Sequence, residues 1–245
     1  MVNQANQLRE KRMIVLGGTS GFGKQIAILA LKRDARVIVV GRSEAHLRQT
    51  LAELAAYRVR LSGRVLDVGK EDRLDRLFEE TGPYDHLVSM IGGAMSGGFL
   101  KTPVSQIRQA IEEKFFANLV IAQHAAGHIN AHGSMIFTAG AGGHPYDASG
   151  AVIGNQAIRT MVQGLAMELA PAIRVNAVAP AWTPTGLWRR LSAEQLQATT
   201  GQMSETIPLR RVADPKEVAS AYLFLMSNHF VTGQTLTVDG GFSFI

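Results

Sequence analysis

Short apolar runs alternate with longer amphipathic segments along the whole chain. The runs are rich in Val, Ile and Leu, which is typical of strands that helices cover on both faces, and therefore of a parallel sheet. Strands are predicted at residues 12–17, 35–41, 63–68, 85–91, 133–139, 173–180 and 234–240. Helical patterns separate them, most clearly at residues 23–33, 44–56, 103–129 and 148–170.

This alternation predicts the fold class. Strands and helices that follow one another with right-handed crossovers give a doubly wound α/β sheet, the Rossmann fold. No linker, repeat or low-complexity segment divides the 245 residues, so we predict a single domain over residues 1–245.

Composition narrows the function. The chain has no cysteine, which excludes disulfides and thiolate catalysis and favours a cytoplasmic protein. No segment approaches the roughly 18 apolar residues of a membrane span, and residues 1–12 lack the apolar core of a signal peptide. The net charge of +5 comes from scattered Lys and Arg, so we expect it to attract an anionic cofactor and expect no nucleic-acid partner.

A glycine-rich stretch, VLGGTSGFGKQIA, joins the first strand to the first helix. Glycine permits the tight turn and the close approach of a pyrophosphate, and the helix N-terminus offers free N–H groups to the phosphates. Such spacing also occurs in turns that bind nothing, but its place after the first strand favours a dinucleotide site. The predicted binding residues are Gly17, Thr19, Ser20, Gly21, Phe22 and Gly23.

The end of the second strand indicates which dinucleotide binds. An NAD site needs an acidic residue there for the ribose hydroxyls. This chain instead has Arg42 after Gly41, and a guanidinium suits a 2′-phosphate. Although Arg42 could be a solvated loop residue, we predict NADP(H) as the cofactor.

With these motifs, together with LDV at 66–68, IRVNAVAP at 173–180 and VTGQTLTVDGG at 231–241, the chain resembles the short-chain dehydrogenase/reductase family over essentially its whole length. The resemblance implies that Asp67 hydrogen-bonds the adenine amino group and that Thr185 contacts the nicotinamide end. It adds three further cofactor-binding positions, Val68, Gly92 and Pro180.

The usual catalytic dyad of that family is absent. Its members reduce carbonyls with an Asn-Ser-Tyr-Lys set, in which Tyr donates the proton and a Lys four residues later lowers the tyrosine pKa. The ending LAMELAP fixes the register, placing Ala151 at the tyrosine position and Asn155 at the lysine position. Asn155 could still bind the ribose. The serine position falls near Ala139 or Gly140, with Thr138 as the nearest hydroxyl.

A lysine occupies the position of the family's asparagine. Carrying the usual spacing forward from Gly92 reaches Lys114 in IEEKFFANL. An ammonium there could bind the ribose, polarise a carbonyl or donate a proton. The alternative is a surface lysine paired with Glu112 or Glu113. The apolar residues that follow favour an inward position.

Other candidate acids lie after the fifth predicted strand. His144 and Tyr146 are candidate proton donors, although a loop histidine is often solvated. Ser149 is either a hydrogen-bonding residue of the site or the N-cap of the next helix.

Residues 182–212 interrupt the alternation after the sixth predicted strand. In similar proteins such an insertion forms a mobile lid over the substrate. Its apolar side chains could line a pocket or pack the lid down, and its arginines could attract an anion or face water; these residues are Trp182, Leu187, Trp188, Met203, Arg189, Arg190, Arg210 and Arg211. Residues 92–100, with Met95, would add a flexible wall. The resemblance and the small residues of 144–162 favour a homodimer or homotetramer.

We therefore predict an NADP(H)-dependent oxidoreductase that transfers a hydride to or from a small carbonyl, imine or activated alkene, with a non-standard proton-delivery site and no metal. The alternative from another class is a catalytically silent NADP(H)-binding sensor or structural partner. A non-redox step such as dehydration or isomerisation in the same cleft is the third hypothesis.

Overall fold

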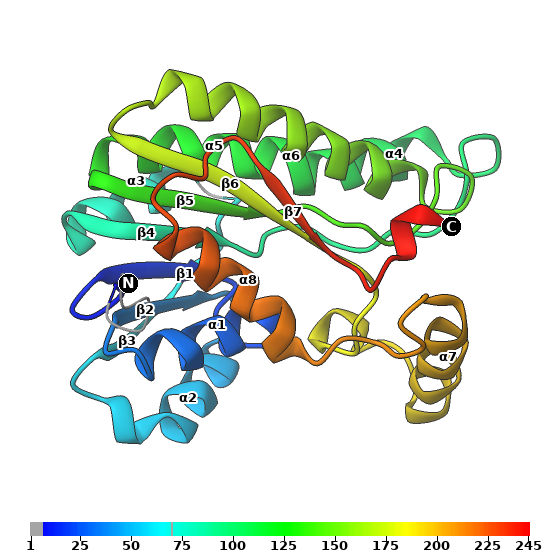
Figure 1. Ribbon diagram of the computed structural model, residues 1–245, viewed down its shortest axis with the longest axis horizontal. Helices are drawn as coiled ribbons and strands as arrows, with labels where there is room; N and C mark the ends of the chain where they lie inside the picture. The colour runs from blue at the N-terminus through cyan, green and yellow to red at the C-terminus, as the bar shows by residue number, and fades with distance from the viewer. Residues whose placement is uncertain (1–6, 70) are drawn as a thin grey trace.

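The computed structural model describes residues 7–69 and 71–245, and its centre is one seven-stranded parallel sheet (Figure 1). The order is β3-β2-β1-β4-β5-β6-β7, which confirms the doubly wound α/β fold. The strands are β1 (Arg12–Leu16), β2 (Arg36–Gly41), β3 (Leu61–Val65), β4 (Tyr84–Ser89), β5 (Ile129–Thr138), β6 (Ile173–Pro180) and β7 (Thr235–Val238).

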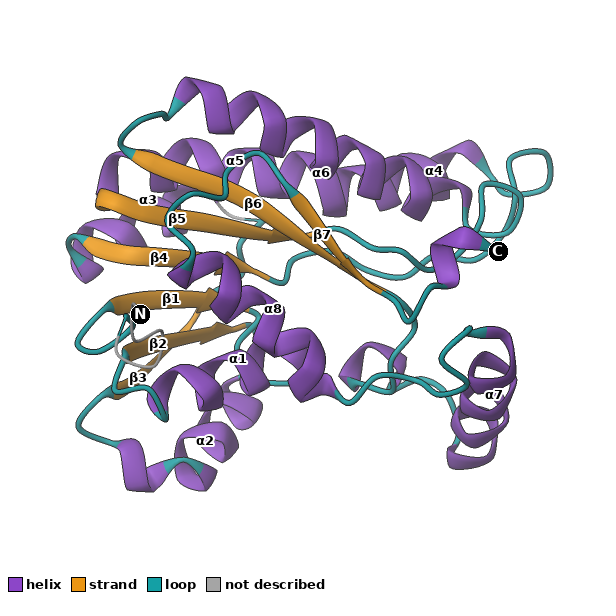
Figure 2. Cartoon of the chain, in the orientation of Figure 1, coloured by secondary structure: helices purple, strands orange, loops and turns teal. Residues whose placement is uncertain are grey.

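Helices cover both faces of the sheet (Figure 2). One layer holds α1 (Gly21–Leu31), α2 (Glu44–Glu53) and α8 (Pro215–Ser227), and the other holds α3 (Glu71–Thr81), α4 (Val104–Ile111), α5 (Ala117–Ala125) and α6 (Ser149–Glu168). Because successive strand residues point to opposite faces, the central strands contribute side chains to two cores. Val15 and Ile136 pack on the α1–α8 side, whereas Ile14 and Phe137 pack on the α5–α6 side.

The last crossover departs from the expected handedness. The chain passes from β5 to β6 through α6, and from β6 to β7 in the same direction across the sheet, but through α8 on the opposite face. These two crossovers therefore have opposite hands, and the expectation of uniformly right-handed crossovers is wrong. Residues 181–214, which separate β6 from α8, are long enough to carry the chain to the other face.

Several predicted element boundaries were wrong, and two of them concern the predicted site residues. Strand β3 ends at Val65, so Asp67 and Val68 belong to the following loop. The predicted helix 103–129 consists of α4, a π-helical turn at Glu112–Phe116, α5 and a 3-10 turn, after which β5 starts at Ile129. The π-helical turn carries Lys114.

Residues 182–212 form a separate small unit beside the carboxyl ends of the strands (Figure 1). It contains the 3-10 turn Gly186–Trp188 and helix α7 (Ala193–Thr206), which starts with a capping box between Ser192 and Gln195. None of the helices in the described ranges is both long and apolar enough to cross a membrane.

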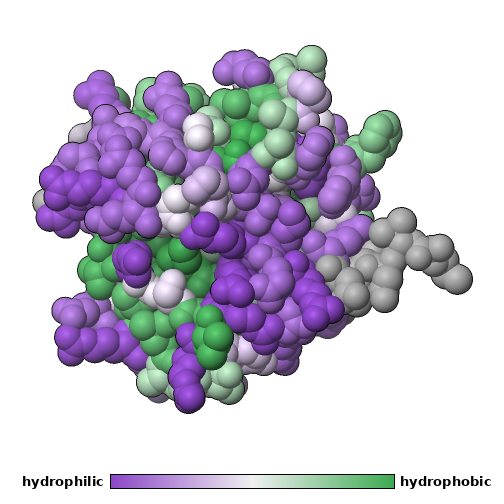
Figure 3. Space-filling model, turned by 90° about the vertical axis from the view of Figure 1, so that its left-hand side faces the viewer, coloured by the Kyte–Doolittle hydropathy of each residue, from purple (hydrophilic) through white to green (hydrophobic). Residues whose placement is uncertain are grey.

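The opposite end of the molecule, where the strands begin, is mostly hydrophilic with apolar side chains between the charged ones (Figure 3). An open hollow of about 250 Å³ at the starts of β1, β2 and β3 is lined by Arg12, Arg36, Arg58 and Arg60. Part of the positive charge therefore lies at this end of the molecule, where Arg36 pairs with Glu10 and Arg60 with Asp34.

Candidate active site

The glycine-rich loop after β1 has the shape of a phosphate cradle. Gly17 has a φ of +80°, which favours glycine, and a Cβ on Gly23 would overlap the carbonyl oxygen of Gly17. Ser20, the N-cap of α1, gives the helix no side-chain hydrogen bond. The N–H groups of the first turn thus keep their capacity to bind an anion.

The segment after β6 crosses this loop. A Cβ on Gly21 would lie 3.2 Å from the Cβ of Thr185, and one on Gly186 would lie 3.4 Å from the hydroxyl oxygen of Ser20. Thr185 also accepts a hydrogen bond from the N–H of Leu187 and so caps the 3-10 turn. The structure therefore brings Thr185 to the glycine-rich loop, with Pro180 buried at the end of β6.

Arg42 and Asp67 lie at the ends of neighbouring strands. The N–H of Leu66 donates to the carbonyl of Gly41 over 3.0 Å, which holds the loop after β3 beside the end of β2. Asp67 is exposed and accepts a hydrogen bond from the N–H of Gly69. Arg42 is exposed and makes no hydrogen bond or ion pair within the described ranges. Its guanidinium is therefore available to a ligand.

Lys114 is buried, which confirms its predicted inward position. Its residue is only 7% exposed, and its side chain lies between two glycines. A Cβ on Gly92 would overlap its Cδ and lie 3.0 Å from Nζ, while a Cβ on Gly154 would lie 3.0 Å from its Cβ and Cγ. The only acceptor of the ammonium in the described part of the chain is the carbonyl oxygen of Ala139, at 3.5 Å.

The alternative of a surface lysine paired with a neighbouring glutamate is wrong. Glu113 accepts a hydrogen bond from Gln109, and neither Glu112 nor Glu113 pairs with Lys114. Because burial removes water from the charged form, the pKa of Lys114 falls from 10.5 to about 8. Such an amine can both donate and accept a proton near neutral pH.

Asn118, which the sequence reasoning missed, holds the π-helical turn in place. Its amide nitrogen donates to the carbonyl oxygens of Lys114 (2.5 Å) and Ile91 (3.2 Å), and its amide oxygen accepts from the hydroxyl of Ser89 (2.6 Å). One fully buried side chain thus ties Lys114 to the end of β4. The available signal was a single asparagine within the apolar stretch FFANLVIA.

Asn155 faces the end of β5, as Lys114 does. A Cβ on Gly140 would lie 2.5 Å from the amide nitrogen of Asn155, and the preceding residue, Ala139, supplies the acceptor for Lys114. Thr138 points to the other face, where its hydroxyl donates to the carbonyl of Ser89 and contacts the hydroxyl of Tyr222 on α8. Thr138 therefore does not replace the family serine.

His144 and Tyr146 form a ring pair away from Lys114. Their centroids are 5.1 Å apart with nearly parallel planes, and His144 also packs on Phe242, at 5.7 Å. Tyr146 is 74% exposed. Within the described ranges, no hydrogen bond or ring contact joins either side chain to Lys114 or Asn155. The structure thus assembles two of the four predicted catalytic residues.

The wall formed by residues 92–100 is anchored to the start of α6. Ser149 is the first residue of that helix and not its N-cap, and its hydroxyl donates to the carbonyl of Gly97 over 2.9 Å. Gly97 also pairs with Ala148 in a short parallel bridge. The wall is therefore attached, whereas the sequence had suggested a flexible one.

The side chains of residues 182–212 mostly pack among themselves. The rings of Trp182 and Trp188 stack at 5.7 Å, and Met203 packs on a small core formed by Ala181, Ile207 and Phe242. Packing is therefore observed for Trp188 and Met203, whereas Trp182 both stacks on Trp188 and lines a hollow. Leu187 stays half exposed.

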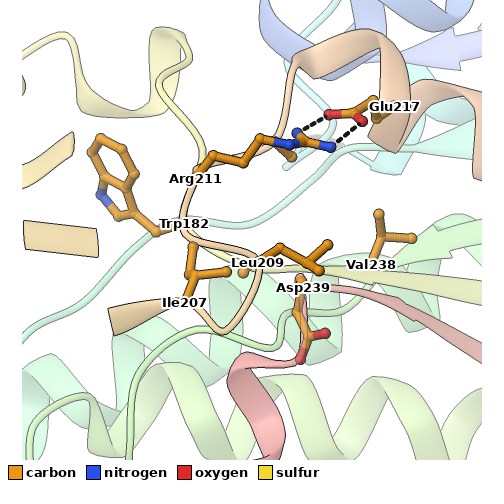
Figure 4. A pocket seen from close by; sticks show the side chains of 10 residues that line it. Trp182, Ile207, Leu209, Arg211, Glu217, Val238 and Asp239 are labelled. Atoms are coloured by element: carbon orange, nitrogen blue, oxygen red, sulfur yellow. Dashed lines mark hydrogen bonds and ion pairs between the residues drawn. The ribbon is translucent and has the colours of Figure 1, made fainter. Parts of the chain in front are cut away.

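A hollow of about 90 Å³ lies between this segment, α8 and the end of β7 (Figure 4). Arg211 makes two 2.7 Å hydrogen bonds to Glu217 at its side, so this arginine is already neutralised. Lys114 and Asn155 are not among the residues that line this hollow, which is therefore distinct from the ends of β4 and β5 where Lys114 lies.

The protein is a doubly wound α/β protein whose strand order reverses between β1 and β4. The glycine-rich loop lies at the end of β1, and Lys114 lies at the ends of β4 and β5. A family model described as "Enoyl-(Acyl carrier protein) reductase" matches residues 17–243. The chain is 31% identical over 254 residues to the short-chain dehydrogenase/reductase fsr5 of Gibberella fujikuroi, covering 96% of both chains.

Two further comparisons agree. Carbonyl reductase family member 4 of Xenopus tropicalis is 30% identical, with 93% of this chain and 95% of the relative covered. A solved small-chain dehydrogenase in complex with NADPH superposes with a TM-score of 0.80 at 29% identity, covering 96% of this chain and 100% of that one. The chain therefore belongs to the short-chain dehydrogenase/reductase family.

Proposed function

We propose that this protein is an NADP(H)-dependent oxidoreductase in which Lys114 takes over the electrophilic and proton-donating role of the missing tyrosine. The observation that carries the proposal is the buried amine of Lys114 at the ends of β4 and β5, with a lowered pKa and no carboxylate partner in the described part of the chain. Its substrate class is a small carbonyl compound, imine or activated alkene.

The residues present fit a dinucleotide. The glycine-rich loop and the uncapped start of α1 would hold the pyrophosphate, Arg42 the 2′-phosphate and Asp67 the adenine. Gly92 and Thr185 would border the nicotinamide, which supplies or accepts a hydride when bound. The NADPH complex of the 29% identical relative supports this choice of cofactor.

Lys114 would act by charge and by proton transfer. As an ammonium in a site with little water, it stabilises negative charge on a substrate oxygen or nitrogen. With its pKa near 8, it can also release a proton to that atom at neutral pH. Asn155 does not titrate, so its role would be to hold ribose or substrate hydroxyls by hydrogen bonds.

The cofactor assignment is tested by fluorescence titration with NADPH and NADH. We expect tighter binding of NADPH in the wild type and loss of that preference in Arg42→Ala, by roughly 10- to 100-fold for a charge-assisted contact. Arg48→Ala, which removes an exposed arginine from α2, is the matched control and should keep the preference. Equal affinity for both nucleotides in the wild type would contradict the assignment.

The catalytic assignment is tested by NADPH oxidation against a panel of aldehydes, ketones, imines and enones. Lys114→Ala should bind NADPH but lose turnover by about 100-fold or more, the usual effect of removing an acid or an electrophile. Tyr146→Phe should be nearly unchanged, because Tyr146 is exposed and apart from Lys114. If the wild type and Lys114→Ala turn over equally, the assignment fails.

A second candidate function is a silent NADP(H)-binding protein that acts as a sensor or structural partner. It is favoured by the apolar positions Ala139, Gly140 and Ala151, where the family has its serine and tyrosine. Tight NADPH binding without turnover of any panel substrate would support this candidate over the enzyme.

A further inference from the structure

The amine of Lys114 has the surroundings of a nucleophile more than those of a structural cation. A structural ammonium makes two or three hydrogen bonds or an ion pair. Lys114 has one acceptor at 3.5 Å, and no carboxylate lies within 4.0 Å of its nitrogen among the residues that the structure describes. The cost of burying the charged form of Lys114 is therefore not offset by hydrogen bonds or an ion pair with the described residues.

The nitrogen lies close to the protein surface on one side. Nζ is next to the exposed residue Gly92, which has no side chain to cover the amine. On the other side are Ala139, Gly140 and the amide of Asn155. None of these four residues has a side chain with an acidic proton, so Lys114 itself is the acid nearest to an oxygen that becomes negative among them.

We propose that the Lys114 amine condenses with the carbonyl group of a conjugated aldehyde or ketone to form an imine at the ends of β4 and β5. The lone pair of Nζ attacks the carbonyl carbon and a C–N bond forms. The carbonyl oxygen then leaves as water with the two amine protons, and a C=N bond replaces the C=O bond. This inference rests on the proposed function, which places a small carbonyl compound at Lys114.

The chemistry of the site agrees with this step. An amine must be neutral to attack, and desolvation in an apolar surrounding is one way in which proteins activate lysine. Burial lowers the pKa of Lys114 to about 8, so a large fraction of the amine is neutral at that pH. The amide of Asn155 is placed beside the same strand end, where it can hydrogen-bond the departing hydroxyl.

Formation of an imine favours particular substrates in a site that lacks the tyrosine acid. The imine nitrogen takes up one proton from water. The protonated imine withdraws electrons more strongly than its parent carbonyl, so it activates a conjugated C=C bond. The oxygen has already left as water, and no acid is needed to protonate it. Conjugated aldehydes and ketones are therefore favoured over simple ketones within the proposed substrate class.

The test uses the full-length protein without nucleotide. Wild-type protein is incubated at pH 8 with cinnamaldehyde and sodium cyanoborohydride, which reduces an imine to a stable secondary amine, and the labelled lysines are identified by peptide mass spectrometry. We expect Lys114 to carry at least about tenfold more label than the exposed Lys216, since far more of a desolvated amine is neutral at this pH. Lys114→Arg keeps the charge and should lose this label, whereas Lys216→Arg should retain it.

Label spread over the surface lysines with Lys114 unmodified would overturn the inference, and this readout needs only the wild type. NADPH binding is measured separately by fluorescence. Binding of NADPH without label on Lys114 would overturn the imine and leave the proposed oxidoreductase intact. Label on Lys114 without nucleotide binding would overturn the oxidoreductase and support the reactive amine.

Discussion

Burial of Lys114 links the stability of the protein to pH. Its pKa is about 8 in the folded protein and 10.5 in the reference state, so between these values the unfolded chain binds more protons. The free energy of unfolding contributed by Lys114 therefore rises with pH across this window, by about 3 kcal/mol in total. Lys114→Met should remove this rise and be the more stable protein at pH 7.

Urea unfolding of both proteins at pH 7 to 10 measures this difference. The buried Tyr84 and Tyr222, whose pKa values are raised by burial, titrate in both proteins and cancel in the comparison. Lys216→Met, at an exposed position on α8, is the control and should follow the wild type. A difference between wild type and Lys114→Met that is independent of pH would contradict the buried, titrating amine.

At the scale of residues, the direction of a side chain was predictable where strand alternation determines it. Phe137 and Ala139 face α5 and α6, so alternation along β5 requires Thr138 to face α8, away from Lys114. The inward position of Lys114 followed from the apolar residues beside it. The role of Asn118 did not follow, because two of its three partners lie at the end of β4 and are distant in sequence.

At the scale of elements, Asn118 stabilises the π-helical turn that carries Lys114. A π-helical turn shifts the backbone bonding from i+4 to i+5, and π-turns occur often at functional sites. Asn118→Leu would leave the buried carbonyl of Lys114 and the hydroxyl of Ser89 without this partner. We expect a loss of about 2–4 kcal/mol in the free energy of unfolding, because unsatisfied buried polar groups are costly.

Chemical denaturation measures this loss, with Gln123→Leu as the control because Gln123 is an exposed amide on the same helix. The control should change stability by less than about 0.5 kcal/mol, as surface substitutions usually do. If Asn118→Leu is as stable as the control, the π-helical turn does not depend on this side chain.

Elements were predictable from the hydrophobic period, but their interruptions were not. The pattern of residues 103–129 predicts one helix, because one extra residue in a turn shifts the apolar face without removing it. The small residues of 144–162 were predicted to serve contacts between subunits, but two glycines of α6 make contacts within the chain. Gly154 makes room for Lys114, and a Cβ on Gly150 would contact Met95 and Ala110, so these small residues serve the protein's own chain.

At the scale of the whole molecule, strand–helix alternation was enough to predict the parallel sheet. It did not predict the hand of the last crossover, which depends on the long connection after β6. The first six strands follow the doubly wound order, whereas residues 181–214 move the chain to the opposite face before β7. Local patterns do not encode such a change of face. The same connection brings Thr185 onto the glycine-rich loop, so one segment provides both the last crossover and the cover of this loop.

Assembly is the remaining prediction at this scale. The π-helical turn and α6 are packed on each other, and Phe116 and Ile153 expose 45% and 37% of their surface there. Exposed apolar side chains on adjoining elements are typical of subunit interfaces.

We expect light scattering to show a homodimer or homotetramer. The double substitution Phe116→Lys and Ile153→Lys should reduce the mass to that of a single chain, because two charges per subunit would be buried in an isologous contact. Val59→Lys, at an exposed apolar position near β3, should keep the wild-type mass. A wild type that is monomeric at micromolar concentration would contradict the prediction, and an oligomer that survives the double substitution would place the interface on another face.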